Sequence, residues 1–226
     1  MTITAIDVLD KGYVRVVDVM GDDRSIVNAA RVSFQQDVDE LSIKDKNLIK
    51  NLAGDRHTSP FRHAFLTFEV KAPLMVCRQW QKYVVGSDHT MDAWNEVSRR
   101  YVTSEPEYYI PTEWRNSPKN KKQGSDGAHD ESKVFTSRLK TLTTYCSDYY
   151  DHAIKSGIAP EQARLFLPAY AMYTQWRWSA SLQSVIHFLS QRLQDDAQFE
   201  IFQYAEAVYK LVEERFPVSL KAFIGP

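Results

Sequence analysis

The alternation of apolar and polar residues marks three segments of the chain as strands. Residues 13–20 alternate well enough to form a strand. In residues 64–72, Ala, Leu, Phe and Val alternate with Phe, Thr, Glu and Lys, which is the period of a half-buried strand, and Pro73 is expected to end it. Residues 170–178 are rich in the aromatic residues that favour strands.

Apolar residues at spacings of three and four predict helices in much of the remaining chain. The longest such pattern runs from residue 135 to about residue 156. Other helices are expected after the acidic turn at 21–23, at 42–52, at 74–82, from residue 160, at 181–192 and at 197–215. The apolar stripe predicted for the last of these helices consists of Phe202, Ala205, Tyr209, Val212 and Phe216.

The strands are few and are separated by helices, so the predicted fold class is α+β. A chain of 226 residues is long enough to bury one full core and shows no internal repeat, which predicts a single domain over residues 1–226. Residues 115–131 contain neither Val nor Leu but several turn formers and lysines, so we expect a flexible surface loop there.

Composition narrows the classes of function. The chain has 28 Lys+Arg and 29 Asp+Glu, whereas general binding to a nucleic-acid backbone normally needs a basic excess. No window approaches the roughly 18 consecutive apolar residues of a membrane span, and the first residues lack the pattern of a secretory signal. Cys77 and Cys146 are too few for a disulfide framework. We therefore expect a cytoplasmic protein with reduced thiols that binds neither nucleic acid nor membranes.

General catalytic motifs are absent from the sequence. It contains no GxGxxG, GxxxxGK[ST], GxSxG, HExxH or CxxC pattern, which weakens the corresponding nucleotide-binding, hydrolase and zinc-enzyme interpretations. His57, Ser59 and His63 cluster before a predicted strand, where they fit either a capped tight turn or a binding site. Two histidines at this spacing lack the further ligands that zinc requires, so no metal site is expected.

Arginine residues in apolar surroundings are a stronger chemical signal. Arg78 and Gln79 interrupt a helix that otherwise looks buried, and a buried arginine needs an anion or a carboxylate as partner. Cys77 is adjacent to Arg78 and is a candidate nucleophile, but a plain buried thiol is the better interpretation. Arg164 and Arg192 also lie against apolar helix faces, and a guanidinium suits bidentate recognition of a phosphate or of a pyrimidine edge.

Residues 95–101 hold the densest polar cluster. If this segment is extended, Glu96, Ser98 and Arg100 share one face, where they can hold a phosphate and a sugar. A solvated charged face explains the same residues equally well. Ser98 is assigned to binding rather than to nucleophilic attack because the sequence shows no adjacent general base. With the arginines above, the cluster predicts an assembled site for an anion attached to a heterocycle.

Six motifs, in the order found here, resemble those of a known family. They are Ala29-Ala-Arg-Val-Ser-Phe, His57-Thr-Ser-Pro-Phe-Arg-His, Arg78-Gln-Trp, Asn95-Glu-Val-Ser-Arg-Arg-Tyr, Ala163-Arg-Leu-Phe-Leu-Pro and Gln191-Arg with Ala197-Gln. Over nearly its whole length the chain thereby resembles the flavin-dependent thymidylate synthases (ThyX). The resemblance implies a small, mostly antiparallel sheet packed by long helices.

The resemblance also implies a reaction, namely the reductive methylation of dUMP to dTMP. Methylenetetrahydrofolate, a folate, would donate the carbon, and FAD reduced by NADPH would carry the hydride. The family implies a homotetramer whose active sites lie between subunits. Two alternatives stay open: a related flavin-dependent modification of dUMP such as hydroxymethylation, and a non-catalytic homologue that binds dUMP.

The roles of family residues map onto matching positions of this chain. The implied dUMP contacts are Arg78, Gln79, Glu96, Ser98, Arg100, Arg164 and Arg192. The implied FAD contacts are His57, Ser59, Lys82, Tyr83, Glu96, Ser181 and His187. Arg192 is the implied catalytic residue because it resembles the arginine that holds the uracil edge and favours its N3-deprotonated form. There it would stabilise the negative charge that develops when a nucleophile or hydride adds at C6.

One segment departs from the family pattern. Where the family has Arg-His-Arg, this chain has Lys82-Tyr83-Val84, followed by a longer spacer in which residues 88–93 are the expected insert. The lost basic residues contact the flavin in the family. Lys82 is expected to replace one positive charge, and Tyr83 is expected to stack on a ring.

Overall fold

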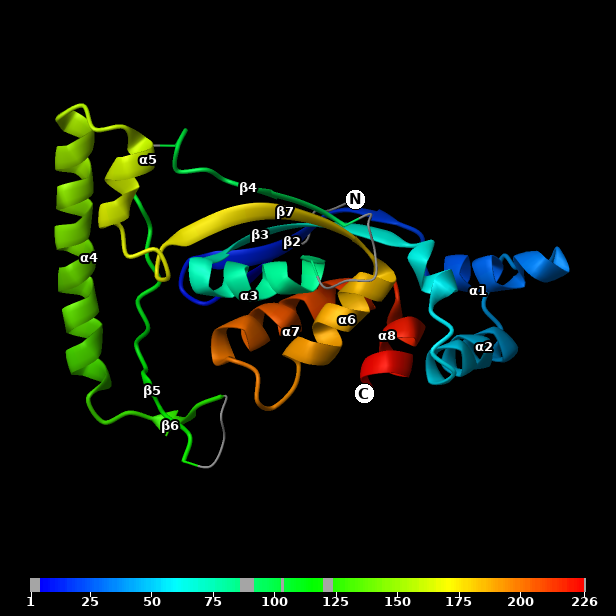
Figure 1. Ribbon diagram of the computed structural model, residues 1–226. Helices are drawn as coiled ribbons and strands as arrows, with labels where there is room; N and C mark the ends of the chain where they lie inside the picture. Colours follow the sequence, from blue (N-terminus) through cyan, green and yellow to red (C-terminus); the bar gives the residue numbers. More distant parts are fainter. Residues whose placement is uncertain (1–4, 86–91, 103, 120–123, 226) are drawn as a thin grey trace.

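The computed structural model describes residues 5–85, 92–102, 104–119 and 124–225. Its centre is a five-stranded antiparallel sheet with the strand order β1-β2-β3-β7-β4. The strands are β1 Ala5–Val8, β2 Gly12–Met20, β3 Phe65–Pro73, β7 Tyr173–Ser181 and β4 Ala93–Glu96. Figure 1 shows helices over one face of this sheet, so the fold class is α+β, as predicted.

The three predicted strands are present, and two edge strands were missed. β2 and β3 coincide with the predicted segments, and β3 ends at Pro73. β7 begins only at Tyr173, because Ala171 and Met172 donate backbone hydrogen bonds back to residues 168 and 169 in a turn. β1 and β4 have four residues each, which is too short for alternation to stand out.

The predicted helices are present, and one more closes the chain. Their bounds are α1 Asp23–Arg31, α2 Ile43–Gly54, α3 Leu74–Val85, α4 Ser132–Lys155, α5 Pro160–Ala163, α6 Leu182–Arg192, α7 Phe199–Glu213 and α8 Pro217–Ile224. Asp22 and Ser42 form capping boxes that set the starts of α1 and α2. α8 was not predicted as a separate helix.

The buried stripe of α7 differs from the predicted one. The buried apolar residues of α7 are Ile201, Tyr204, Ala205, Ala207, Val208, Leu211 and Val212. The predicted Phe202 and Tyr209 are only partly buried. Because α7 carries apolar residues on more than one side, spacing alone does not identify the side that meets the sheet.

The main core lies between the sheet and the helices α3, α6, α7 and α8 (Figure 1). Trp80 of α3 is fully buried and stacks on Phe188 of α6, with ring centroids 4.3 Å apart. Its ring also meets Trp176 and Trp178 of β7 edge-on, at 5.4 Å and 5.6 Å. Trp80 therefore fixes α3 to both the sheet and α6.

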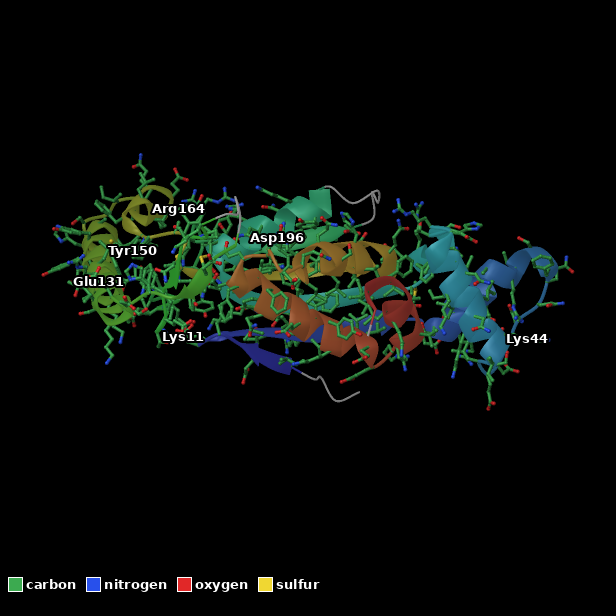
Figure 2. The ribbon with its side chains drawn as sticks, turned by 90° about the horizontal axis from the view of Figure 1, so that it is seen from below. Lys11, Lys44, Glu131, Tyr150, Arg164 and Asp196 are labelled. Atoms are coloured by element: carbon green, nitrogen blue, oxygen red, sulfur yellow. The ribbon has the colours of Figure 1, made fainter. Side chains whose placement is uncertain are left out.

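A second, smaller core supports α4 and residues 160–172, together called the arm, at one end of the molecule. α4 lies at the opposite end from α1 and α2, and the molecule is elongated in both views (Figures 1 and 2). Tyr150 and Ala153 of α4 pack with Ala163, Leu167 and Met172. This packing places Arg164, which Figure 2 labels, beside the end of the sheet.

The prediction of a loop over residues 115–131 is wrong in part. Strand β5 (Arg115–Asn116) pairs with β6 (Asp126–Ala128), and residues 120–123 lie outside the described residues. Arg115 forms an ion pair with Glu200 of α7, which ties the hairpin to the main body. Polar side chains hold this segment through partners distant in sequence, which composition does not reveal.

The sheet face opposite the helices carries a charged ladder across three strands. Arg15, Glu69 and Arg177 lie side by side in the register of β2, β3 and β7. Glu69 is buried, accepts a hydrogen bond from the Tyr13 hydroxyl at 2.8 Å and pairs with Arg15 at 2.8 Å. Burial by itself raises the pKa of Glu69, but the hydrogen bonds from Arg15 and Tyr13 outweigh it and hold that pKa below the usual range.

This depressed pKa predicts a loss of stability in acid. Because the folded-state pKa of Glu69 lies below the unfolded value of about 4.3, its contribution is present above that pH and is lost as the pH falls through the folded-state pKa. We expect Glu69→Gln to flatten the fall in the free energy of unfolding between neutral and acid pH. Urea unfolding at a series of pH values measures this; an unchanged slope would contradict it.

Candidate functional site

Helix α3 supplies the first site residues. It starts directly after Pro73 at the end of β3 and buries Val76, Cys77 and Trp80 against the core. The expectation of a buried Arg78 is wrong: Arg78 is exposed. Arg78 directly follows the buried residues Val76 and Cys77. Lys82 lies four residues later, about one helical turn, and is also exposed, so both residues lie on the same side of α3. α3 therefore presents its polar residues to solvent at the end of the sheet.

Four arginines line one cavity of about 910 Å³, here called the arginine cavity. They are Arg78, Arg99, Arg100 and Arg164, and Glu96 and Ser98 line the same cavity. Within the described part of the chain, none of the four lies within ion-pair distance of a carboxylate. Guanidiniums without carboxylate partners that converge on one cavity favour an anionic ligand such as a phosphate.

Glu96 reaches this cavity from the helix side of the edge strand β4. Its Oε1 accepts a hydrogen bond from the Thr174 hydroxyl at 3.0 Å, and its Oε2 accepts one from the Cys77 thiol at 3.6 Å. Burial, followed by the nearby Glu96 charge, raises the pKa of the Cys77 thiol. Cys77 is fully buried, so its interpretation as a plain buried thiol is confirmed.

The segment after Glu96 is not extended, contrary to the condition set for a shared face. Residues 99–101 form a turn, with the Tyr101 backbone N–H donating to the Ser98 carbonyl. The Ser98 hydroxyl accepts hydrogen bonds from the backbone N–H and the Nε of Arg100, both at 3.3 Å. The turn still brings Ser98 and Arg100 to the arginine cavity. Arg99, for which no role was predicted, joins them through this turn.

A second cavity, of about 800 Å³, lies between α3 and the start of α7 and is here called the glutamine cavity. Gln79, Lys82 and Arg192 line it, together with aromatic residues that include Tyr109 and Trp114. A third cavity of about 960 Å³ shares Gln79 and Lys82 with the glutamine cavity and shares Arg78 with the arginine cavity. The three cavities therefore adjoin one another along α3.

Arg192 is held at the end of α6 by Tyr83. Its guanidinium lies 4.5 Å from the centre of the Tyr83 ring and donates a hydrogen bond to the Tyr83 hydroxyl. The Nε of Arg192 is buried and has no hydrogen-bond partner in the described residues. A buried donor without a partner is costly, so this atom is suited to a ligand. Arg192 covers one face of the Tyr83 ring, which was expected to stack on a flavin ring.

The remaining expected FAD contacts are His187 in the middle of α6, whose ring centroid lies 5.7 Å from that of Tyr83, and a group near the start of α6. Ser181 caps α6 and is buried, while Arg62, which ends the 3₁₀ turn Ser59–Arg62, donates to Gln183 at 2.9 Å. His57, Ser59 and His187 are exposed. None of these residues lines the three cavities described above. α6 has 11 residues, which corresponds to roughly 16 Å between Ser181 before its start and Arg192 at its end.

Several residues of the glutamine cavity were missed by sequence reasoning. Glu200 is buried, forms an ion pair with Arg115 and accepts hydrogen bonds from the Tyr109 hydroxyl and the Gln198 amide. The signal was a carboxylate and an amide at the start of an apolar helix, but their partners lie far away in sequence. The expected insert at 88–93 lies largely outside the described residues; Asp92 accepts a hydrogen bond from Ser184 at 3.1 Å.

The described ranges contain neither a metal-binding cluster nor a membrane-spanning helix. No group of three or more His, Cys, Asp or Glu side chains there is arranged to hold a metal ion. No helix in those ranges is long and apolar enough to cross a membrane.

Comparison with known proteins gives consistent matches. The family model described as thymidylate synthase complementing protein matches residues 15–218. A flavin-dependent thymidylate synthase of Thermus thermophilus is 42% identical over 96% of this chain and 77% of its own length. One of Thermosipho melanesiensis is 37% identical over 96% of this chain and 92% of its own length.

A solved structure matches as well. The UMP/dUMP methylase PolB from Streptomyces cacaoi, bound with 5-Br UMP, superposes with a TM-score of 0.82 at 27% identity. The match covers 97% of this chain and 96% of that chain.

Proposed function

The chain belongs to the family of flavin-dependent thymidylate synthases, and on that premise we propose that it methylates dUMP to dTMP with FAD, methylenetetrahydrofolate and NADPH. The observation that carries the proposal is the arginine cavity, because its guanidiniums, which pair with no carboxylate of the described residues, suit the phosphate of a nucleotide. The adjoining glutamine cavity, with Gln79 and Arg192, suits the attached base.

The proposal gives the expected dUMP contacts the following roles. Arg78, Arg100 and Arg164 hold the phosphate, with Ser98 keeping Arg100 in position through its hydroxyl. Glu96 accepts hydrogen bonds and suits a sugar hydroxyl. Arg192 donates to a uracil carbonyl oxygen, where negative charge develops when a group adds at C6.

The residues fit a flavin in part. Bound flavin would supply hydride transfer, which no side chain of this protein can provide. Lys82 offers an exposed cation in the cavity that Arg192 also lines, and Glu96 of β4 lines the arginine cavity. The exposed side of α6 leads from there to His187, Ser59 and His57, a path that suits an elongated dinucleotide. Ser181 is occupied as a helix cap, so its part would be to fix the start of α6.

We also propose that the working form is a homotetramer with sites between subunits. Lys82 and Glu96 of the expected FAD contacts line the same cavities as the expected dUMP contacts, whereas His57, Ser59, Ser181 and His187 line none of the three cavities. The arm exposes large apolar side chains, with Tyr145 and Tyr149 each 60% exposed and Leu165 82% exposed. Such residues suit burial against another copy.

A cytoplasmic location is proposed from the two free cysteines.

The experiment that tests this function is direct. The purified protein is incubated with FAD, dUMP, methylenetetrahydrofolate and NADPH, and the nucleotide product is identified by mass spectrometry. We expect bound flavin in the absorption spectrum and a product of the mass of dTMP. A hydroxymethylated product would favour the related chemistry, and dUMP binding without flavin or turnover would favour a non-catalytic homologue. UMP is included because the structural relative acts on UMP as well as dUMP.

Tyr83 offers a graded test of how Arg192 is held. Tyr83→Phe removes the hydroxyl acceptor but keeps the ring, whereas Tyr83→Ala removes both contacts. We expect kcat to fall about threefold in the first variant and about tenfold in the second, since each contact is worth about 0.7 kcal/mol. Steady-state kinetics measures this, and a wild-type kcat in both variants would show that Tyr83 does not position Arg192.

A further inference from the structure

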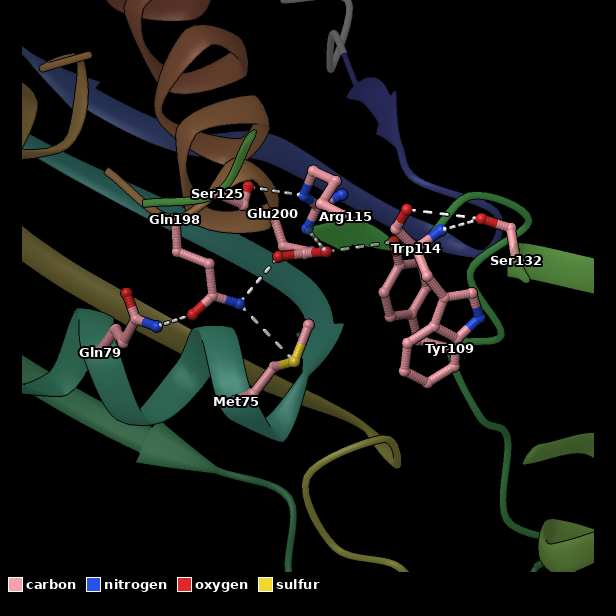
Figure 3. Close-up of polar contacts among 9 residues, drawn as sticks. All are labelled: Met75, Gln79, Tyr109, Trp114, Arg115, Ser125, Ser132, Gln198 and Glu200. Carbon is pink, nitrogen blue, oxygen red and sulfur yellow. Dashed lines mark hydrogen bonds and ion pairs between the residues drawn. The ribbon is translucent and has the colours of Figure 1, made fainter. Parts of the chain in front are cut away.

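A chain of side-chain hydrogen bonds runs from buried Glu200 to the surface of α3 (Figure 3). Glu200 pairs with Arg115 of β5 and accepts a hydrogen bond from Nε2 of Gln198 at 2.8 Å. The same Nε2 lies 3.8 Å from the sulfur of Met75 as a second acceptor. The Oε1 of Gln198 accepts a hydrogen bond from Nε2 of Gln79. Two amides in series therefore connect the buried carboxylate to a residue that lines the glutamine cavity.

The carboxylate determines which way both amides point. An ionised carboxylate paired with a guanidinium only accepts hydrogen bonds, so Gln198 must present its amino group to Glu200. Its oxygen then faces Gln79, which must answer with its own amino group. If either amide turned over, two acceptors or two donors would face each other. Gln79 is left with its oxygen turned away from Gln198 (Figure 3), and its second N–H has no hydrogen-bond partner among the described residues.

We propose that Glu200 and Gln198 are positioning residues that hold Gln79 in one orientation, and that this orientation selects uracil over cytosine. The inference rests on the proposed function, because it takes Gln79 as a contact of the base. The hydrogen bonds that link Glu200, Gln198 and Gln79 are the observation behind it.

The selection follows from the pairing edges of the two bases. Uracil carries an N–H donor at N3 between two carbonyl acceptors, whereas cytosine carries an acceptor at N3 beside an amino donor. An amide fixed with its oxygen toward N3 and an N–H toward the neighbouring carbonyl matches uracil and opposes cytosine. Arg192 lines the same cavity and has only donors, so it also disfavours the cytosine amino group.

The same geometry affects the proton at N3. An acceptor placed there stabilises the protonated ring, whereas Arg192 favours negative charge on the base. Releasing Gln79 would allow its amide to turn and donate to a deprotonated N3. The chain from Glu200 therefore raises the pH at which bound dUMP loses its N3 proton, and breaking the chain lowers that pH.

The test uses the flavin-loaded protein and compares four forms: wild type, Gln198→Met, Glu200→Gln and the control Gln203→Met. Gln198→Met keeps a side chain of similar length but removes the hydrogen bonds of the Gln198 amide to Glu200 and Gln79. Glu200→Gln keeps the shape of the side chain but can donate as well as accept, so it no longer fixes which way the two amides point. Gln203 is a matched control because it lies on α7, which begins directly after Gln198, and its amide also donates a hydrogen bond to a carboxylate, that of Glu206. Calorimetry gives the dissociation constants of dUMP and dCMP, and ultraviolet titration of bound dUMP gives its ionisation.

In Gln198→Met and in Glu200→Gln we expect the preference for dUMP over dCMP to fall about threefold to tenfold, the range for one neutral hydrogen bond. We also expect bound dUMP to ionise at lower pH than in the wild type, while Gln203→Met leaves both quantities unchanged. An unchanged preference in both folded variants would overturn the inference; if one variant fails to fold by circular dichroism, the other decides. A wild type that binds neither nucleotide would instead refute the proposed function itself.

Discussion

Replacing Arg192 with alanine is expected to lower kcat for dUMP methylation by about 10²- to 10³-fold, the usual cost of removing one donor from a site that stabilises developing negative charge. The expectation rests on the place of Arg192 in the glutamine cavity and on its buried Nε, which has no partner in the described residues. Arg192→Lys restores the charge but not the planar fork, so we expect it to recover little activity.

The measurement is kcat and KM for dUMP by product formation, with bound flavin determined in each variant. Arg215→Ala serves as the control because Arg215 is exposed beyond the end of α7 and lines none of the cavities described. We expect it to retain wild-type kcat. A kcat for Arg192→Ala within threefold of wild type, at full flavin occupancy, would show that Arg192 does not stabilise the reacting base.

Trp80→Ala is expected to lower the free energy of unfolding by about 3–5 kcal/mol, as for other large aromatic residues removed from a packed core. Trp80 is fully buried and stacks on Phe188 while meeting Trp176 and Trp178 edge-on. The loss would also loosen α3, whose neighbouring Gln79 faces the glutamine cavity.

Urea unfolding followed by circular dichroism measures this loss. Trp80→Phe is the matched variant because it keeps an aromatic ring against Phe188, and we expect it to cost clearly less than Trp80→Ala. A loss below about 1 kcal/mol for Trp80→Ala would mean that the core closes around the missing ring, which is unusual for a fully buried tryptophan.

Much of the fold could be predicted because local pattern and long-range packing agree. The alternation in β3 and the capping residues Asp22 and Ser42 report conformations that the local chain already favours. The short edge strand β4 and the β5–β6 hairpin escaped because their stability comes from partners elsewhere. Arg115 pairs with Glu200, and no local spacing links two residues so far apart.

The site shows the same division. Residue type and motif identified Arg78, Arg100 and Arg164, and the structure brings all three to one cavity. Sequence did not reveal that Arg78 would be exposed, since helix orientation depends on which side meets the core. It also did not reveal the bond from Gln79 to Gln198, which joins residues on two helices.

The central claim is that the arginine cavity holds the phosphate of dUMP, and titration with dUMP and with deoxyuridine tests it most directly. Because two or more charge-assisted hydrogen bonds would be lost with the phosphate, we expect dUMP to bind at least about 100-fold more tightly. Arg164→Ala should reduce that difference to about tenfold or less. Equal affinities of the wild-type protein for dUMP and deoxyuridine would contradict the account.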